Sequence, residues 1–356
     1  PRCRENGDGS LRKCACSSDG PSRWIEAKDF EASSTGSVTF QLIVAQNCMY
    51  ANDHGEAKSI RASVDMKPPP FDYARAESVD EAVALLAKHG DEAKIIAGGQ
   101  SLMPMLAFRM AEPRLLVDIG SISKLRGIEI SERGVTLGAL VRWCDIERQP
   151  ELSHAHPLLV EAIKHVAHYQ IRNRGTVGGS LAHADPAAEF LGIAVACEAQ
   201  INVVGLNGPR TILASEFFVD SLTTALLPDE VIVSVRLPPW RVGRCWGFDE
   251  FARRRGDFAL AGVALFYDHE RGRVVDSRVA AIGIGTTPLR LTAVEQILVG
   301  HTIDLAKIRH AVTTATESVD PPGDIHAPGD YRRALIGVLL ERALMKAAGL
   351  SPSEAG

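Results

Sequence analysis

Regular spacing of apolar residues begins after Met66, and the first element it predicts is a helix. Ser78 precedes Glu81 by three residues, which is the spacing of an N-terminal capping box. Gly90 follows the last apolar residue and is typical of a helix end. An amphipathic helix is therefore predicted between Ser78 and Gly90, with an apolar face made of Val79, Ala82, Val83 and Leu86.

Continuous apolar runs predict buried strands, and alternation around a glycine-bearing turn predicts hairpins. The predicted strands are residues 93–97, 114–119 and 231–237. Hairpins are predicted for residues 128–137, which turn near Gly134, and for residues 201–213, which turn at 205–209. Residues 156–168 have a helical period.

Pro238 and Pro239 interrupt the pattern and predict a domain boundary. Three strands are predicted after them, at residues 248–253, 260–267 and 278–283, and then three helices, at residues 291–298, 304–314 and 330–348. This order indicates a three-stranded sheet covered by helices. We therefore expect an α+β protein in two lobes, not a doubly wound sheet, with one domain over residues 66–240 and a smaller one over 241–356.

Residues 1–65 lack such order. Residues 1–23 mix Arg, Gly, Ser, Asp and Cys without a period, and residues 38–44 form one short strand at most. We expect a poorly ordered extension that the fold does not use and that need not be native. A partner-binding tail is the alternative.

Composition and charge argue against a nucleic-acid-binding protein, a membrane-spanning protein and a secreted protein. The 356 residues carry a formal net charge of −5, which argues against nucleic acid as the main partner. No apolar run approaches the roughly 18 residues of a membrane span, and the N-terminus does not read as a secretory signal. A cytoplasmic location is the resulting expectation.

Metal-binding patterns are absent from the sequence. The seven cysteines form no C-x-x-C pair, so no zinc or iron–sulfur site is predicted. His165 and His168 are placed on one helix by their spacing, but an exposed helix face explains them better than a metal site. No nucleophile and base arrangement is evident, so no catalytic residue is assigned.

Two segments with a Gly-Gly pair, residues 97–101 and 175–180, are the candidate ligand-binding elements. Glycine lets a backbone approach a ligand, and successive N–H groups in such a loop suit a pyrophosphate. Neither segment is a Walker A sequence or a G-x-G-x-x-G fingerprint. Taken alone, each is explained better by a tight turn than by a ligand.

Their flanking residues make a more specific pattern. The first segment reads Ala-Gly-Gly-Gln-Ser-Leu-Met-Pro from Ala97, and the second reads Thr-Val-Gly-Gly-Ser-Leu-Ala-His-Ala-Asp-Pro-Ala-Ala-Glu from Thr176. With Gly-Asp-Phe-Ala-Leu-Ala-Gly from Gly256, the chain resembles the FAD-binding medium subunit of the molybdenum hydroxylases, the carbon monoxide dehydrogenase and xanthine dehydrogenase family. The resemblance extends from Met66 to the last predicted helix.

The resemblance implies a PCMH-type FAD-binding domain and a set of FAD-binding residues. The two segments would wrap the diphosphate and ribityl chain; their residues are Ala97, Gly98, Gly99, Gln100 and Ser101, and Thr176, Val177, Gly178, Gly179 and Ser180. Glu189 would accept a hydrogen bond from an FAD hydroxyl, and Asp185 is a second candidate. Phe258 would pack against the isoalloxazine ring, and Val231 and Ile232 would touch its edge. The alternatives are acids at a helix start, a core phenylalanine and a buried strand.

The resemblance also implies partners. An iron–sulfur small subunit and a large subunit with the molybdenum cofactor would form a heterotrimer with this chain, and [2Fe-2S] clusters would pass electrons through FAD to NAD, a quinone or another acceptor. A self-sufficient FAD-dependent oxidoreductase of the same fold is the second hypothesis. A non-catalytic scaffold that has lost the cofactor is the third.

Overall fold

The computed structural model describes residues 49–51, 57–59 and 67–350. The chain separates into two compact units, Pro1–Met66 and Lys67–Gly356. In the first unit, β1 (Met49–Ala51) pairs antiparallel with β2 (Ala57–Ser59). The strand considered for residues 38–44 lies outside the described residues.

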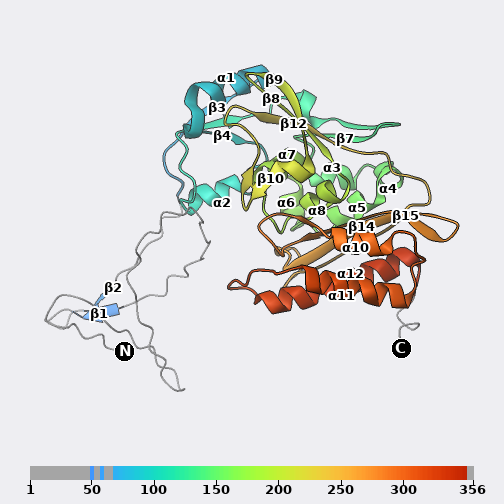
Figure 1. The fold of residues 1–356 in the computed structure, drawn as a ribbon. Coiled ribbons are helices and arrows are strands. Elements are labelled where there is room, and N and C mark those ends of the chain that lie inside the picture. The colour runs from blue at the N-terminus through green and yellow to red at the C-terminus, as the bar shows by residue number, and fades with distance from the viewer. Residues whose placement is uncertain (1–48, 52–56, 60–66, 351–356) are drawn as a thin grey trace. The chain divides into compact units, whose positions relative to one another are not determined.

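The second unit begins with a small parallel sheet in the order β3-β5-β4, flanked by helix α1 (Figure 1). The elements are β3 (Asp72–Arg75), α1 (Val79–His89), β4 (Ala93–Ile96), α2 (Leu102–Ala107) and β5 (Leu115–Asp118), with short 3-10 turns at Gly90–Glu92 and Ser123–Arg126. The apolar face predicted for α1 packs on β5, because Val83 and Leu86 share a core with Val117. Helix and strands are confirmed.

The N-terminal cap of α1 differs from the prediction in one bond. Ser78 accepts the N–H of Glu81, as expected. The Glu81 carboxylate, however, accepts the N–H of Glu77 at 2.8 Å and not that of Ser78. The reciprocal half of the predicted capping box is therefore displaced by one residue.

A five-stranded antiparallel sheet follows, in the order β6-β7-β12-β8-β9. Its strands are β6 (Ile128–Ser131), β7 (Gly134–Gly138), β8 (Gln200–Gly205), β9 (Gly208–Leu213) and β12 (Val231–Leu237). A two-stranded pair, β10 (Phe218–Asp220) and β11 (Thr223–Thr224), lies between β9 and β12 in sequence. Both predicted hairpins and the strand at 231–237 are confirmed.

Short helices lie between and beyond these strands. They are α3 (Trp143–Glu147), α4 (Leu152–Ala155), α5 (Pro157–Ile163), α6 (Tyr169–Arg172), α7 (Val177–His183), α8 (Glu189–Ala196) and α9 (Ala214–Phe217). All eight residues of α8 are buried, because it packs against β14 and β15 of the C-terminal sheet on one side and against α5 and α7 on the other. This burial on every side explains why the segment is apolar without a stripe.

The single helix predicted over residues 156–168 is wrong. Helix α5 ends at Ile163, and His168 is the N-cap of α6. Between them Ala167 has φ 41°, a left-handed conformation that no α-helix continues through. His165 and His168 therefore do not share a helix, and within residues 67–350 no group of three or more potential metal ligands comes together.

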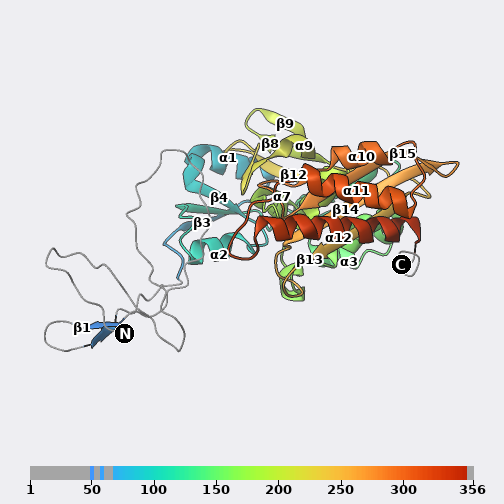
Figure 2. The same ribbon diagram turned by 60° about the horizontal axis from the view of Figure 1, so that its bottom comes forward.

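The C-terminal part is a sheet with helices on one face and α8 on the other (Figure 1). Its strands, in the order of the sheet, are β13 (Cys245–Phe251), β14 (Ala261–Glu270), β15 (Arg273–Ile282) and β16 (Leu289–Arg290). Its helices are α10 (Thr292–Leu298), α11 (Leu305–Ser318) and α12 (Gly329–Ala348), which lie side by side over the strands in Figure 2. Side chains of β14 alternate between faces: Val263 and Leu265 face the helices, and Ala264 and Phe266 face α8.

The α+β fold in two lobes is confirmed. The sheet predicted with three strands has a fourth, β16, whose two residues are too few to leave a period in the sequence. Among the described helices none is long and apolar enough to cross a membrane.

Candidate functional site

The first glycine segment is a loop between β4 and α2, as predicted. Gly99 has φ 72°, a conformation that favours glycine. The Gln100 side chain folds back and donates to the carbonyl of Gly98 at 3.1 Å. The peptide N–H groups of the four residues 98–101 have no acceptor in the described part of the chain. Four successive donors are thus available to a ligand.

The second segment is the start of a helix, so the prediction of a loop there is wrong. Thr176 caps α7, and its Oγ1 accepts the N–H of Gly179 at 3.2 Å. The N–H groups of Val177 and Gly178 donate to the carbonyls of Val141 and Ala139, at 2.9 and 2.8 Å. The N–H of Ser180 bonds within the helix turn to Thr176. The N–H groups of residues 177–180 are therefore already satisfied, and the hydroxyls of Thr176 and Ser180 remain for a ligand.

The two segments touch although they are far apart in the sequence. A Cβ on Gly98 would stand closer than 3.0 Å to the carbonyl oxygen of Arg174, a separation that real Cβ atoms do not show. Arg174 Nε in turn lies 3.4 Å from the Gly98 carbonyl and donates to it. Glycine at position 98 lets the two backbones meet and form one continuous wall.

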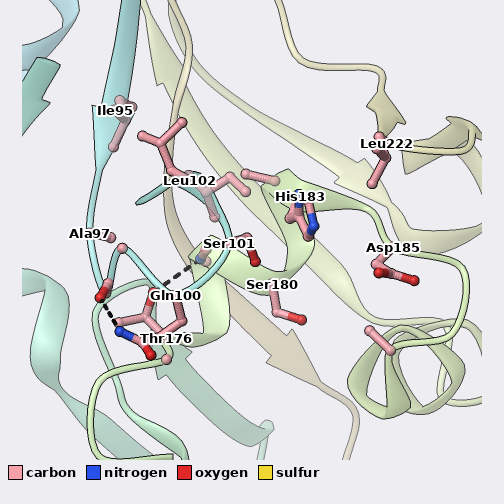
Figure 3. Close-up of a pocket in the computed structure, with 18 of the residues that line it drawn as sticks. Ile95, Ala97, Gln100, Ser101, Leu102, Thr176, Ser180, His183, Asp185 and Leu222 are labelled. Atoms are coloured by element: carbon pink, nitrogen blue, oxygen red, sulfur yellow. Dashed lines mark hydrogen bonds between the residues drawn. The ribbon is translucent and has the colours of Figure 1, made fainter. Parts of the chain in front are cut away.

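That wall belongs to a cavity of about 670 Å³, within the usual range for a small-molecule site. Figure 3 shows Ala97 and Gln100 beside Thr176 and Ser180, with His183 and Asp185 farther along. Of the predicted cofactor-binding residues, all but Val177 line the cavity: Ala97, Gly98, Gly99, Gln100, Ser101, Thr176, Gly178, Gly179, Ser180, Asp185, Glu189, Val231, Ile232 and Phe258. Val177 is buried in the core under the cavity.

The cavity is also lined by residues that the sequence analysis did not propose, and most of them belong to no recognisable motif. Trp143 and Val166 come from core elements, and Leu222 comes from the turn between β10 and β11. Leu222 has φ 55° and donates its N–H to the Ala184 carbonyl, which places the turn beside α7. Asp257 stands inside a recognised motif and could have been proposed from it.

The acids of the cavity are buried. Glu189, the first residue of α8, is 7% exposed, and burial followed by the charge of Glu250 raises its pKa to about 8. Burial also raises the pKa of Asp185, whose Oδ1 accepts the N–H of Ala187 at 2.9 Å. Near neutral pH Glu189 is thus protonated, and it can donate a hydrogen bond as well as accept one.

The apolar candidates fall into two kinds. Val231 and Ile232 are buried at the start of β12 and also line the cavity. The two explanations, a buried strand and a cavity wall, are therefore both correct for these residues. Phe258 lines the cavity while 70% exposed, which excludes the alternative of a core phenylalanine. It stands on a turn whose Gly256 has φ 87° and packs against His168.

One cavity combines free backbone donors, two converging glycine segments and an apolar ring. These features define a nucleotide-cofactor protein of the flavoprotein class. Residues 69–240 match the family model for the FAD binding domain in molybdopterin dehydrogenase, and residues 246–347 match the CO dehydrogenase flavoprotein C-terminal domain. The chain belongs to the family of FAD-binding medium subunits of the molybdenum hydroxylases. It is therefore an FAD-binding oxidoreductase component.

Individual relatives agree with this assignment. The 6-hydroxypseudooxynicotine dehydrogenase complex subunit alpha of Paenarthrobacter nicotinovorans is 43% identical over 79% of this chain and 96% of its own length. The carbon monoxide dehydrogenase medium chain of Hydrogenophaga pseudoflava is 37% identical over 78% and 97%. A chain of the solved carbon monoxide dehydrogenase from that organism superposes with a TM-score of 0.78, at 38% identity, over 80% of this chain and 99% of that one. Relatives are thus named as subunits of larger enzymes.

Proposed function

We propose that this chain is the electron-transfer subunit of a molybdenum hydroxylase, which passes electrons from [2Fe-2S] clusters through FAD to an external acceptor. The clusters would lie in a small partner subunit and the molybdenum cofactor in a large one. NAD, a quinone or another carrier would accept the electrons. The observation that carries the proposal is the contact between the two glycine segments, which sets four free N–H donors on one wall of the cavity.

The first segment fits the FAD diphosphate. Residues 98–101 present unpaired N–H groups, and diphosphate oxygens are strong acceptors for such donors. The hydroxyls of Ser101, Thr176 and Ser180 line the same wall and can bond the diphosphate or the ribityl chain. Bound FAD would supply two-electron redox chemistry, and this chain would supply position and shielding from water.

The far end of the cavity suits the flavin ring. The exposed ring of Phe258 would cover one isoalloxazine face, as aromatic stacking favours. Val231 and Ile232 would border the ring with apolar side chains, and protonated Glu189 would hold an FAD hydroxyl. We also propose that the domain boundaries follow the sequence prediction, with residues 66–240 binding FAD and 241–356 forming the C-terminal domain.

Substitution of one glycine tests the proposal. G98A sets a methyl group against the Arg174 carbonyl, so the wall must open and the chain should bind FAD at least about tenfold more weakly. G127A is the matched control, because a Cβ there meets nothing within 4 Å. FAD binding is measured by flavin fluorescence and by the visible spectrum of the purified chain.

The partner assignment needs a second readout. With the two partner subunits present, the yellow chain should pass substrate-derived electrons to an acceptor. Substrate turnover by the chain alone would contradict the proposal and favour a self-sufficient flavoenzyme. A chain that stays colourless with added FAD would instead favour a scaffold.

A further inference from the structure

Glu250 on β13 is a buried acid with one oxygen left unpaired. Its side chain is 7% exposed, and its Oε2 has no hydrogen-bond partner among the described residues. Its Oε1 lies 3.4 Å from Nδ1 of His165. A buried carboxyl oxygen without a partner is costly, so such a group is often retained for function.

The inner neighbour of Glu250 is Glu189. Glu189 and Gly192 share a face of α8, three residues apart, and a Cβ on Gly192 would stand 2.8 Å from the Ile282 side chain. A Cβ on Gly262 would stand 2.9 Å from that same Ile282 and 3.2 Å from Cβ of Glu250. The two acids therefore approach each other around one isoleucine, without a direct hydrogen bond between them. Glu189 opens into the cavity.

The outer neighbour of Glu250 is His165. Its side chain is 34% exposed, and its ring packs edge-on against Phe248, with centroids 5.0 Å apart. Packing fixes the ring with Nδ1 toward Glu250 while part of it stays in contact with water. His165, Glu250 and Glu189 thus form a series of proton-exchanging groups from solvent to the cavity wall.

We propose that His165, Glu250 and Glu189 form a proton path between solvent and the FAD cavity. The inference rests on the proposed function. Iron–sulfur clusters deliver electrons without protons, whereas full reduction follows FAD + 2 e⁻ + 2 H⁺ → FADH₂, so protons must reach the cavity separately. Glu189 would first give its own proton to the reduced flavin. It would then be reprotonated from Glu250 through a bridging water, since no direct hydrogen bond joins the two carboxyls, and Glu250 would be reprotonated from the His165 ring. On reoxidation, an acceptor that takes electrons alone leaves two protons to return by the reverse route, whereas hydride transfer to NAD⁺ leaves one, as FADH₂ + NAD⁺ → FAD + NADH + H⁺.

Other ionisable groups surround this series without continuing it. Asp185 interacts with Glu189 and His183 on the cavity side. Asp249, the residue before Glu250, points to the other face of β13, lies 3.9 Å from Arg342 and also interacts electrostatically with His165. Because the pKa of Glu189 is about 8, its carboxyl at the cavity end of the path carries a proton at neutral pH.

The variant E250Q tests the path, with E270Q, an exposed acid at the end of the neighbouring strand β14, as the control. The FAD-loaded full chain is mixed with excess dithionite, and the limiting rate of flavin bleaching is followed in H₂O and in D₂O. We expect E250Q to be slower by at least about tenfold, because positioned proton transfer contributes on the order of 10²–10⁴ in rate. E270Q should keep the rate, and both variants should keep the FAD content.

Two further readouts separate proton transfer from packing. Free imidazole should restore the rate of H165A, which no structural role predicts. Reduced-minus-oxidised infrared spectra of the unsubstituted chain should contain a glutamic acid carboxyl band that E189Q removes. An E250Q rate within about twofold of the unsubstituted chain, with no carboxyl band, would overturn the path. A chain that does not bind FAD would instead refute the proposed function.

Discussion

At the scale of single residues, the site depends on what glycine and burial permit. Gly98 lets two backbones meet at less than a normal Cβ distance, and Glu189 places a proton on the cavity wall. The sequence flanking both residues predicted their membership in the site. It did not predict the Arg174 carbonyl or Glu250 as their neighbours, because such neighbours are set by tertiary packing.

Glu189 predicts a pH dependence of stability. Its pKa is about 8 in the folded chain against an ordinary 4.5, so the folded state binds more protons than the unfolded state between these values. The free energy of unfolding should therefore fall as pH rises through this window, by on the order of a few kcal/mol. E189Q, which never ionises, should flatten the curve. Denaturant titrations at about pH 5 and about pH 8.5 measure it, and an equally steep curve for E189Q would refute this origin.

At the scale of elements, short helices and their ends decide how the cavity is built. Helix α7 forms despite Gly178 and Gly179, because Thr176 caps it and its first turn bonds to the carbonyls of Ala139 and Val141. Tertiary bonds thus outweigh a poor helix propensity. The break between α5 and α6 was also not predictable from the sequence, because the left-handed residue Ala167 is an ordinary helix former. Strands with clear alternation, such as β6 to β9, were predictable.

Arg332 on α12 joins two cavity elements and predicts a loss of stability on substitution. Its Nη1 donates to the carbonyls of Leu260 and Gly283, at 2.6 and 2.7 Å, and the Gly283 N–H donates to Pro186 at 2.9 Å. R332A leaves two buried carbonyls unpaired and should lower the free energy of unfolding by about 3 kcal/mol. FAD affinity should fall with it, because these turns carry Phe258 and Asp185.

The neighbouring Arg333 provides the control for that substitution. Its guanidinium pairs with Asp320 and Asp330, both of which are largely exposed, and its Nε donates to the single carbonyl of Val319 at 3.1 Å. R333A should therefore change stability by at most about 1 kcal/mol. Thermal and denaturant unfolding of both variants give the comparison, and equal losses would contradict a special role for Arg332.

At the scale of the whole molecule, two lobes share α8 as a buried connection. The helix packs on the face of the C-terminal sheet opposite α10 to α12, and its residues share one core with the five-stranded sheet. The order of elements predicted the lobes, and the sequence motifs predicted the two glycine segments of the cavity wall but not Trp143, Val166 or Leu222. The asymmetry of the site was not predictable: the N–H groups of residues 98–101 are free, whereas those of residues 177–180 already bond within the fold.

A crystal structure of the chain with bound FAD tests this asymmetry most directly. The diphosphate oxygens should lie about 2.9 Å from the backbone nitrogens of residues 98–101, with the α7 segment contributing hydroxyls. A diphosphate bound by the N–H groups of residues 177–180, or outside the cavity, would contradict the account.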